Sequence, residues 1–319
     1  MLARLKLNNF LVMGRAGLDL YADPPGTEIE NATQFTAALG GSAANIAVAI
    51  ARQGGKTSLL TSVSDDAVGR HTLKALKSYG VDVGHIKTVG GEARNSLAVV
   101  ETRAENCQSV IYRNNAADFQ VQETDIDAVD FEKFAGLIIT GTALAQQPSR
   151  KATMKALHLA RKNGLVLIID IDYRPYSWPS IQEAQEVCCN AAELCNIIVG
   201  NDEEFDVLAG TNNGFSFARG MADKSKSIVI YKKGANGCTS FSDGGQIETP
   251  IFPVSALKPT GAGDGFMGGF ITGLVSGASV PGAVRRGAAT AAIVVTRVGC
   301  SPAMPSVAEV EQFLINNQN

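Results

Sequence analysis

The sequence lacks the motifs that mark several large classes of protein. It has no G-x-x-x-x-G-K-[ST] loop, which excludes a Walker-type ATPase, and no G-x-G-x-x-G after its first expected strand, which argues against a dinucleotide-binding Rossmann domain. None of its six cysteines forms a C-x-x-C pair or has a histidine at zinc-ligand spacing. The net charge is −3 and no basic block interleaved with aromatics occurs, so nucleic acid is not expected as a partner.

The sequence also has no apolar segment typical of secretion or of a membrane span. The N-terminus lacks the apolar core of a signal peptide. An uncharged run at 265–284 carries Gly265, Gly269, Gly273 and Gly277 at the spacing of a membrane-helix packing face. Its Gly, Ser and Thr content and a proline at 281 favour a tightly packed soluble helix instead. We therefore expect a cytoplasmic protein that does not contact a membrane.

What the sequence does contain is an alternation of strand and helix patterns. Strands are expected at 10–14, 57–63, 137–140, 165–170, 196–200 and 227–232, and helices at 42–54, 149–163, 181–195, 202–209, 264–276 and 282–296. Ser42 is expected to cap the first of these helices, Cys188, Cys189 and Cys195 to fill the apolar side of another, and Ser306 with Glu309 to begin a last one. This alternation predicts an α/β fold with a parallel sheet covered on both faces, and a ligand at the carboxyl ends of its strands.

Two segments do not follow the alternation. Residues 15–38 are rich in turn formers, and residues 94–113 contain two short runs of alternating apolar residues. We expect them to form a small antiparallel element that projects from the core.

The stretch GAGDGF at 261–266 is the strongest candidate for chemistry. Glycines let a backbone approach a ligand closely, and the N-terminus of a helix presents unpaired N–H groups to an anion. Such a loop can hold the charge that develops on a transferred phosphoryl group, and Asp264 can take the proton of an attacking hydroxyl. An acid that only caps a helix after a flexible turn is the alternative interpretation.

Two further motifs follow expected strands and support phosphoryl transfer. In GNDEEF, Asn201 and Glu204 can organise a hydrated Mg²⁺ on nucleotide phosphates, although acids are common at helix N-termini. In KKGANG at 232–237, the backbone can seat a nucleotide, whereas a hairpin turn is the simpler interpretation of the motif alone.

Arginines suggest an acidic substrate. Arg174 follows a buried strand together with Asp170 and Asp172, while Arg113 and Arg15 fall in or near the projecting segments. Guanidinium groups bind carboxylates with two parallel hydrogen bonds, so a converging set favours an acid as ligand. A structural salt bridge is the alternative for each arginine, and the preferred interpretation for Arg15.

Together, GGSAANIA (40–47), GNDEE (200–204), KKGANG and GAGDGF resemble, in order and spacing, the motifs of the ribokinase-like PfkB carbohydrate kinases. The resemblance extends from about residue 10 to residue 305. It implies ATP-dependent phosphorylation of a sugar hydroxyl by a single domain, residues 1–319. The implied fold is a three-layer α/β/α sandwich with a mainly parallel central sheet and a small β-sheet lid at about 15–38 and 94–113. The lid of such kinases often forms a homodimer interface.

The resemblance also implies a role for individual residues. Asp264 matches the general base, and the amides of Gly261, Ala262 and Gly263 match the anion hole. The residues that match substrate contacts are Asp19, Gly41, Asn45, Arg113, Asp172 and Arg174. Those that match the nucleotide site are Asn201, Lys232, Gly234 and Gly237, while Glu204 matches a group tied to Mg²⁺ through water.

Within the family, GRAGLDLY, IYRNNAAD, TGTAL and DIDYRP resemble most the members that phosphorylate 5-dehydro-2-deoxygluconate. A 2-keto-3-deoxygluconate kinase, a fructokinase or nucleoside kinase, and a silent sugar-binding regulator stay open as alternatives. One departure concerns the residues before T-G-A-G-D, where many members carry an acid that helps bind a monovalent cation. Here Lys258 and Pro259 stand at those positions, so a dependence on K⁺ is left open. Lys258 either adds positive charge near the phosphates or faces the solvent.

Overall fold

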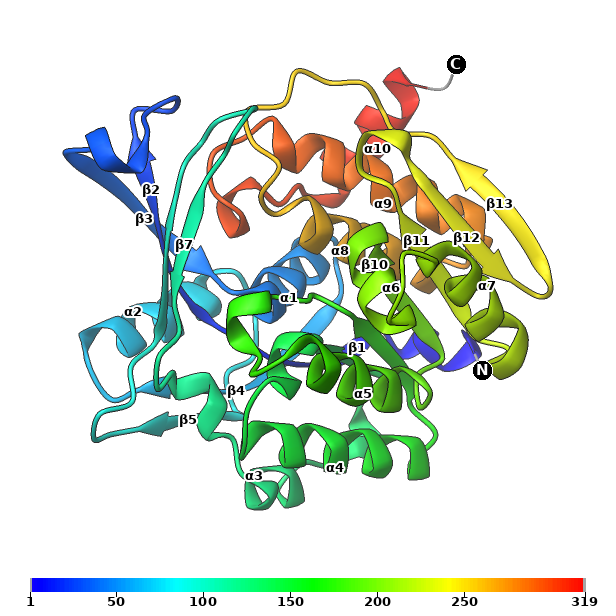
Figure 1. Ribbon diagram of the computed structural model, residues 1–319, viewed down its shortest axis with the longest axis horizontal. Helices are drawn as coiled ribbons and strands as arrows, with labels where there is room; N and C mark the ends of the chain where they lie inside the picture. The colour runs from blue at the N-terminus through cyan, green and yellow to red at the C-terminus, as the bar shows by residue number, and fades with distance from the viewer. Residues whose placement is uncertain (1, 318–319) are drawn as a thin grey trace.

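The computed structural model describes residues 2–317 and is built around a nine-stranded sheet (Figure 1). All strands from β11 to β5 run parallel, and β12 and β13 add an antiparallel edge. In spatial order the strands are β13 (Gly245–Thr249), β12 (Cys238–Ser242), β11 (Ile228–Lys232), β10 (Ile197–Asn201), β9 (Val166–Asp170), β8 (Gly136–Thr140), β1 (Asn9–Met13), β4 (Lys56–Ser64) and β5 (Ile86–Val89).

Helices cover both faces of this sheet. Successive strand residues point to opposite faces, so Ile139 of β8 belongs to one apolar core and Ile138 to the other. The first core is closed by α3 (Glu123–Asp127), α4 (Ser149–Lys162), α5 (Ile181–Ala192), α6 (Asp202–Ala209) and α7 (Gly214–Ser225). The second is closed by α1 (Ser42–Arg52), α2 (Ala67–Ser78), α8 (Ala262–Val275) and α9 (Val280–Val295), with α10 (Val307–Asn316) packed outside α9. The predicted fold class is confirmed.

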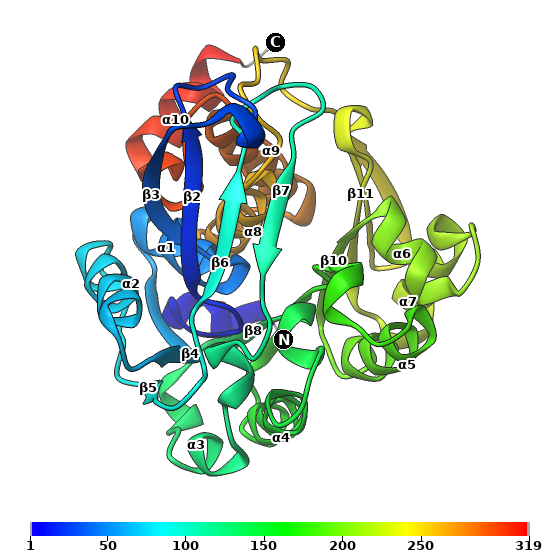
Figure 2. The ribbon, with the colours of Figure 1, turned by 60° about the vertical axis from the view of Figure 1, so that its left-hand side comes forward.

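A second, four-stranded sheet stands beside the first (Figure 2). Its order is β3 (Gln34–Gly40), β2 (Gly17–Asp23), β6 (Ser96–Val100) and β7 (Ser109–Tyr112), and we call it the small sheet. Its central pair, β2 with β6, is parallel, so the prediction of a purely antiparallel element is wrong. The reason is the path of the chain, which enters the small sheet from the core twice, once after β1 and once after β5. As a result, β2 and β6 run in the same direction.

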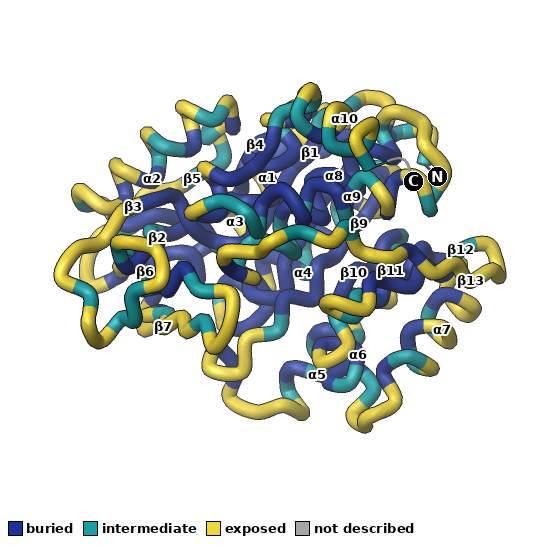
Figure 3. Tube along the Cα trace, turned by 90° about the horizontal axis from the view of Figure 1, so that it is seen from above, coloured by how far each residue is buried: buried dark blue, intermediate teal, exposed yellow. Residues whose placement is uncertain are grey.

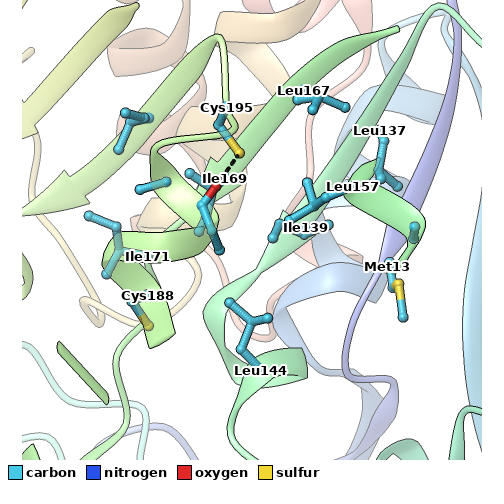
Figure 4. Close-up of a cluster of buried hydrophobic side chains, with 14 of the residues drawn as sticks. Met13, Leu137, Ile139, Leu144, Leu157, Leu167, Ile169, Ile171, Cys188 and Cys195 are labelled. Carbon is cyan, nitrogen blue, oxygen red and sulfur yellow. Dashed lines mark hydrogen bonds between the residues drawn. The ribbon is translucent and has the colours of Figure 1, made fainter. Parts of the chain in front are cut away.

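Most predicted elements lie within a few residues of their expected bounds, and the capping box of Ser306 with Glu309 is confirmed. Two local predictions are wrong. Gly41, with φ 99°, caps α1 in place of Ser42, because a Cβ at this position would lie 2.4 Å from the carbonyl oxygen of Arg15. Cys195 lies beyond the end of α5, in the first apolar core, where its Sγ donates to the carbonyl of Ala191 over 3.3 Å (Figure 4).

The glycines of α8 place its backbone against two neighbouring helices. A Cβ at Gly269 would lie 2.3 Å from Thr290 Oγ1 of α9, and one at Gly268 would lie 2.3 Å from Ala49 Cβ of α1. The helix is therefore deeply buried, as the colouring of Figure 3 shows for α1 and α8. None of the helices in the described part of the chain is long and apolar enough to cross a membrane. The prediction that this glycine run is packing in a protein core is confirmed.

Candidate active site

A cavity of about 760 Å³ lies between the small sheet and the carboxyl ends of the central strands. This is the edge at which α/β folds bind ligands, next to the point between β1 and β8 where the chain changes direction across the sheet. The predicted site residues that line it are Asp19, Asn45, Arg113, Asp172, Arg174, Asn201, Glu204, Lys232, Gly234, Gly261, Gly263 and Asp264. Segments distant in the sequence thus meet as expected.

A second cavity, of about 420 Å³, adjoins the first at the glycine loop. It shares Lys232, Gly234 and Gly263 with the first cavity, and it also contains the predicted residues Gly237 and Ala262. Its remaining walls are mostly apolar and come from the segment 249–256 and from α9. No sequence motif predicts these walls, because ordinary apolar side chains form them.

The carboxylate of Asp264 stands in the first turn of α8. Gly261, with φ 85°, caps this helix, and Asn45 Nδ2 of α1 donates to Asp264 Oδ2 over 2.8 Å. The Oγ of Ser301 donates in turn to Asn45 Oδ1 over 2.6 Å, which fixes the amide so that its NH₂ faces Asp264. Ser301 was not predicted, since an isolated serine carries no sequence signal.

Burial makes Asp264 a stronger base than an exposed aspartate. Burial, reinforced by the nearby carboxylates of Asp172 and Asp170, raises the pKa of Asp264 to about 7, although the hydrogen bond from Asn45 opposes the shift. A carboxylate with a pKa near neutrality accepts a proton readily and is still ionised in half or more of the molecules at pH 7 and above. The site therefore contains a group suited to general-base catalysis.

The residues 260–263, which we call the anion loop, turn tightly into α8. The first N–H groups of a helix have no partner within it and attract anions. The amide of Ala262 donates to the carbonyl of Pro259 over 3.3 Å, so within residues 2–317 it is the one of the three predicted amide donors that is already hydrogen-bonded. Lys232 Nζ lies 3.5 Å from the place of a Cβ on Gly263, so a positive charge borders the loop.

Lys232 is held among acids at the ends of β9 and β10. Its Nζ lies 3.6 Å from Asp170 Oδ1, and although burial opposes it, Asp170 and Glu204 raise the pKa of Lys232. The lysine is consequently charged over the whole neutral range.

Glu204 is buried and already bonded through both carboxylate oxygens. Oε2 accepts from the amide of Asn201 over 2.7 Å, and Oε1 accepts from the amide of Tyr173 over 3.1 Å. Asn201 Oδ1 accepts from the amide of Glu204 over 2.8 Å, so the pair is a capping box for α6. Burial raises the pKa of Glu204 to about 7. Asn201 and Glu204 therefore cap α6 and also line the cavity, while their predicted part in organising Mg²⁺ stays a prediction.

Asp19 lies on the inner face of the small sheet. It is 4% exposed, its Oδ2 accepts from the hydroxyl of Tyr21 over 3.2 Å, and its Oδ1 has no hydrogen-bond partner within the described residues. Burial raises the pKa of Asp19, while Arg15 opposes this shift. A buried carboxylate oxygen without a donor favours a ligand that brings hydroxyl groups.

Three arginines line the cavity, and their charges are balanced differently. Arg113 forms a buried ion pair with Asp118 and donates to the carbonyl of Thr142 over 3.0 Å. Arg174 Nη2 lies 2.8 Å from Asp172 Oδ1. The charge of each of these arginines is thus offset by a carboxylate of the protein.

Arg15 differs from the other two. Its Nη1 donates to Ser96 Oγ over 3.1 Å, and no acid within residues 2–317 pairs with it. The interpretation of Arg15 as part of a structural salt bridge is therefore wrong. Its signal in the sequence was only its place at the end of the first strand.

Gly41 and Lys258 each differ from one of the placements predicted for them. Gly41 lines neither cavity, and its effect is to let α1 begin against the backbone of Arg15. Lys258 is 0% exposed, so the alternative that it faces the solvent is wrong. KKGANG joins β11 to β12 as a hairpin, and its Lys232 and Gly234 border both cavities, while its part in seating a nucleotide stays a prediction.

Comparison with known proteins gives the family. The model of the pfkB family carbohydrate kinases matches residues 8–307. A 5-dehydro-2-deoxygluconokinase of Geobacillus kaustophilus is 38% identical over 317 residues, which cover 98% of this chain and 95% of that protein. The chain therefore belongs to the PfkB family of carbohydrate kinases, and it is a phosphotransferase that acts on a sugar hydroxyl.

Solved structures agree with the observed fold. A fructokinase double mutant from Vibrio cholerae O395, solved with fructose, ADP and a potassium ion, superposes with a TM-score of 0.84 at 26% identity, covering 96% of this chain and 98% of its own. A fructokinase with bound ATP from Xylella fastidiosa gives a TM-score of 0.85 at 22% identity, covering 98% and 99%, and this likeness concerns the fold alone.

Proposed function

We propose that this chain transfers the terminal phosphoryl group of ATP to the primary hydroxyl of a keto sugar acid, 5-dehydro-2-deoxygluconate, giving the 6-phosphate and ADP. The observation that carries the proposal is the position of Asp264. It stands beside the anion loop, at the boundary between a cavity with three arginines and an apolar cavity. The relatives that match nearly the whole chain are named for this substrate, and a fructokinase or nucleoside kinase is not favoured.

In this proposal, one residue accepts the proton, and other residues stabilise the charge on the phosphoryl group. Asp264 takes the proton from the sugar hydroxyl as its oxygen attacks the terminal phosphorus. The amides of Gly261 and Gly263, which have no hydrogen-bond partner among the described residues, and Lys232 stabilise the negative charge on the phosphoryl oxygens. Asn45 orients the Asp264 carboxylate for this step, because its amide is itself held by Ser301.

The apolar cavity suits the base of a nucleotide. It is lined by Phe252, Phe266 and small residues of α9, and it opens toward Lys232 and the anion loop, where phosphates would lie. Gly237, with φ 78°, keeps the hairpin close, since a Cβ there would lie 2.2 Å from the carbonyl of Thr249.

The residues at the ends of β9 and β10 fit Mg²⁺ only through water or phosphate. No group of three metal-binding side chains occurs within residues 2–317, and the oxygens of Glu204 are already bonded to amides. Asp170 Oδ1, Asn201 and Glu204 would therefore hold the hydration shell of the ion. Bound on the phosphates, the ion would neutralise charge that develops during transfer.

Unpartnered donors and acceptors around the first cavity match a hydroxylated acid. Nε and Nη1 of the buried Arg113 have no partner within the described residues, and neither has Asp19 Oδ1. Since Arg113 and Arg174 are each paired with an acid, Arg15, which forms no ion pair within residues 2–317, supplies the positive charge for a carboxylate. We assign Asp19 to the sugar hydroxyls, and Arg15, Arg113, Asp172 and Arg174 to the acid end.

We further propose that residues 1–319 act as one kinase domain whose small sheet closes over the sugar and pairs with a second copy. The inner face of this sheet carries Asp19, while its outer face is apolar. Leu20 pairs with Ala37 and Val99, and Val99 pairs with Val110, which is 44% exposed. A continuous apolar face on an exposed sheet favours association, here as a homodimer.

A panel of substrates tests the proposed function. ATP turnover is measured with 5-dehydro-2-deoxygluconate, 2-keto-3-deoxygluconate, fructose, ribose and adenosine, and we expect the highest kcat/KM with the first. Turnover restricted to a neutral sugar or a nucleoside would overturn the substrate assignment. Sugar binding without turnover of any compound would instead favour a catalytically silent regulator.

A further inference from the structure

Lys258 is a lysine that the fold buries completely. Its side chain is 0% exposed and is among the largest that the fold buries completely. No ion pair joins it to an acid in the part of the chain that the structure describes. Lysine is rarely buried in this way unless it is paired, because desolvating an ammonium group is costly. The position therefore requires a specific reason.

The ammonium group of Lys258 contacts the back of the anion loop. Its Nζ donates a short hydrogen bond to the carbonyl oxygen of Thr260. That oxygen belongs to the same peptide group as the N–H of Gly261, one of the amides at the phosphoryl site. A cation bonded to the oxygen of a peptide group polarises the group and strengthens its N–H as a donor.

The charges around Lys258 come from both sides of the active site. Burial lowers the pKa of Lys258, whereas Cys300, Asp264, Cys107 and Asp19 oppose this shift. Asp264 stands on α8 and Asp19 on the small sheet, so the ammonium group lies in the field of the two functional carboxylates without pairing with either. Lys232 borders the same loop at Gly263. The loop is thus flanked by two ammonium groups.

We propose that Lys258 is a positioning residue whose ammonium group is a built-in cation for the anion loop, so that turnover needs no bound monovalent cation. It holds the Thr260–Gly261 peptide group in place and strengthens the Gly261 amide. The inference rests on the proposed phosphoryl transfer, since it assigns a role to the loop in that reaction.

The first test uses the unaltered enzyme. Its kcat is compared in chlorides of potassium, ammonium and tetramethylammonium at constant ionic strength, with the best sugar of the panel. We expect the three rates to agree within about twofold, because the cation is part of the chain. A strict requirement for potassium or ammonium would overturn the inference.

The second test removes the cation. In Lys258→Ala, loss of the ammonium group should lower kcat by roughly ten- to a hundredfold, with the KM for the sugar changed little, because the loop acts on the transition state. Potassium or ammonium, but not tetramethylammonium, should restore part of this loss by entering the vacated space. Lys258→Met, which fills the space with an apolar chain, should be slow and should not respond.

A control variant and the melting temperature of Lys258→Ala separate this role from a structural one. Lys224→Met removes an exposed lysine of α7, whose Nζ lies 3.0 Å from Glu193, and should behave as the unaltered enzyme in all three salts. Full turnover of Lys258→Ala in tetramethylammonium, or a loss that no cation restores in a variant with an unchanged melting temperature, would overturn the inference.

The inference and the proposed function can fail separately. ADP binding is measured by its effect on the melting temperature in the same three salts, without any sugar. If no sugar is phosphorylated but ADP stabilises the unaltered chain equally in all salts, and Lys258→Ala only with potassium or ammonium, the proposed function fails and the role of Lys258 holds. A salt-dependent effect of ADP on the unaltered chain would overturn the role of Lys258, even if sugar turnover is normal.

Discussion

Asn45 and Asp264, which are 219 positions apart in the chain, are joined by a hydrogen bond of 2.8 Å between side chains of α1 and α8. This bond works against the effect of burial on Asp264, because it stabilises the ionised carboxylate. Ser301 holds the other end of the Asn45 amide. The pKa of Asp264 is therefore determined by two opposing effects. Burial raises it, and the hydrogen bond from Asn45 lowers it.

Replacing Asp264 with Asn should lower kcat by on the order of a hundred- to ten-thousandfold, because the general base is lost while the shape of the site is kept. Steady-state kinetics with the best sugar measure the effect, and the KM for ATP should change little. Turnover at the original rate would remove Asp264 from the mechanism.

The same variant should be more stable than the original protein at pH 8. The pKa of Asp264 is about 7 in the folded state, above the 3.8 of an exposed aspartate, so between these values the folded state binds more protons than the unfolded state. Stability is consequently lost as the pH rises through this window, and the cost is complete above it. We expect Asp264→Asn to raise Tm at pH 8 by about 2–4 °C and to have little effect near pH 4. Equal Tm values for both proteins at pH 8 would contradict a raised pKa.

The pH dependence of turnover should reveal the role of Asn45. For the original enzyme, kcat/KM should fall below about pH 7 as Asp264 becomes protonated. In Asn45→Ala the carboxylate loses its donor, so its pKa rises and the acid limb of the profile moves to higher pH. Ser301→Ala should produce a smaller shift in the same direction. An acid limb that stays in place in both variants would assign it to Glu204, whose pKa is also about 7.

Replacing Arg15 and replacing Arg113 should have different effects on the stability of the protein. Arg15→Gln should lower kcat/KM for the sugar acid by roughly ten- to a hundredfold, the value of a hydrogen bond to a charged group, and leave Tm unchanged. Arg113→Gln should also lower Tm by several degrees, because it leaves the buried Asp118 without its cation.

Arg103→Gln is the matched control for Arg15. Arg103 lies 3.0 Å from Glu28 and 3.4 Å from Glu101, and it does not line the cavity. The variant should therefore keep the original kcat/KM. If Arg15→Gln handled the sugar acid like this control, the uncompensated charge would not be a determinant of specificity.

The outer face of the small sheet should control assembly. Leu20→Lys places a charge in the middle of the apolar face, and we expect it to convert a homodimer into monomers in sedimentation velocity. Sugar affinity should fall as well, since Asp19 precedes Leu20 on β2. Ile247→Lys on β13 places the same charge on an apolar side chain outside the small sheet, one that is 45% exposed, and should leave assembly intact. A monomeric original protein, or a dimeric Leu20→Lys, would contradict the proposal.

The sequence was sufficient to predict the central sheet and the meeting of Asp264 with the strand ends, because apolar periodicity and glycine-rich turns depend on local geometry. It was insufficient for Ser301, Arg15 and Lys258, whose importance depends on what lies around them after folding. The burial of Lys258, for instance, depends on neighbours brought in by folding, such as Val295, whose carbonyl accepts from the Lys258 amide, and no local pattern records them. The parallel pairing of β2 with β6 was missed for a similar reason, since a separate passage of the chain brings in each strand.

The backbone contacts of α8 make the side of the active site that carries Asp264 more rigid than the side formed by the small sheet. Where glycines meet Thr290 and Ala49, the position of the helix is determined by main-chain contact rather than by rotamers that can readjust. Asp264 therefore stands on a rigid support, while Asp19 is carried by a thin sheet with an exposed outer face. Adaptation to a different sugar is accordingly easier through substitutions in the small sheet, because those in α8 would displace the base that every substrate needs.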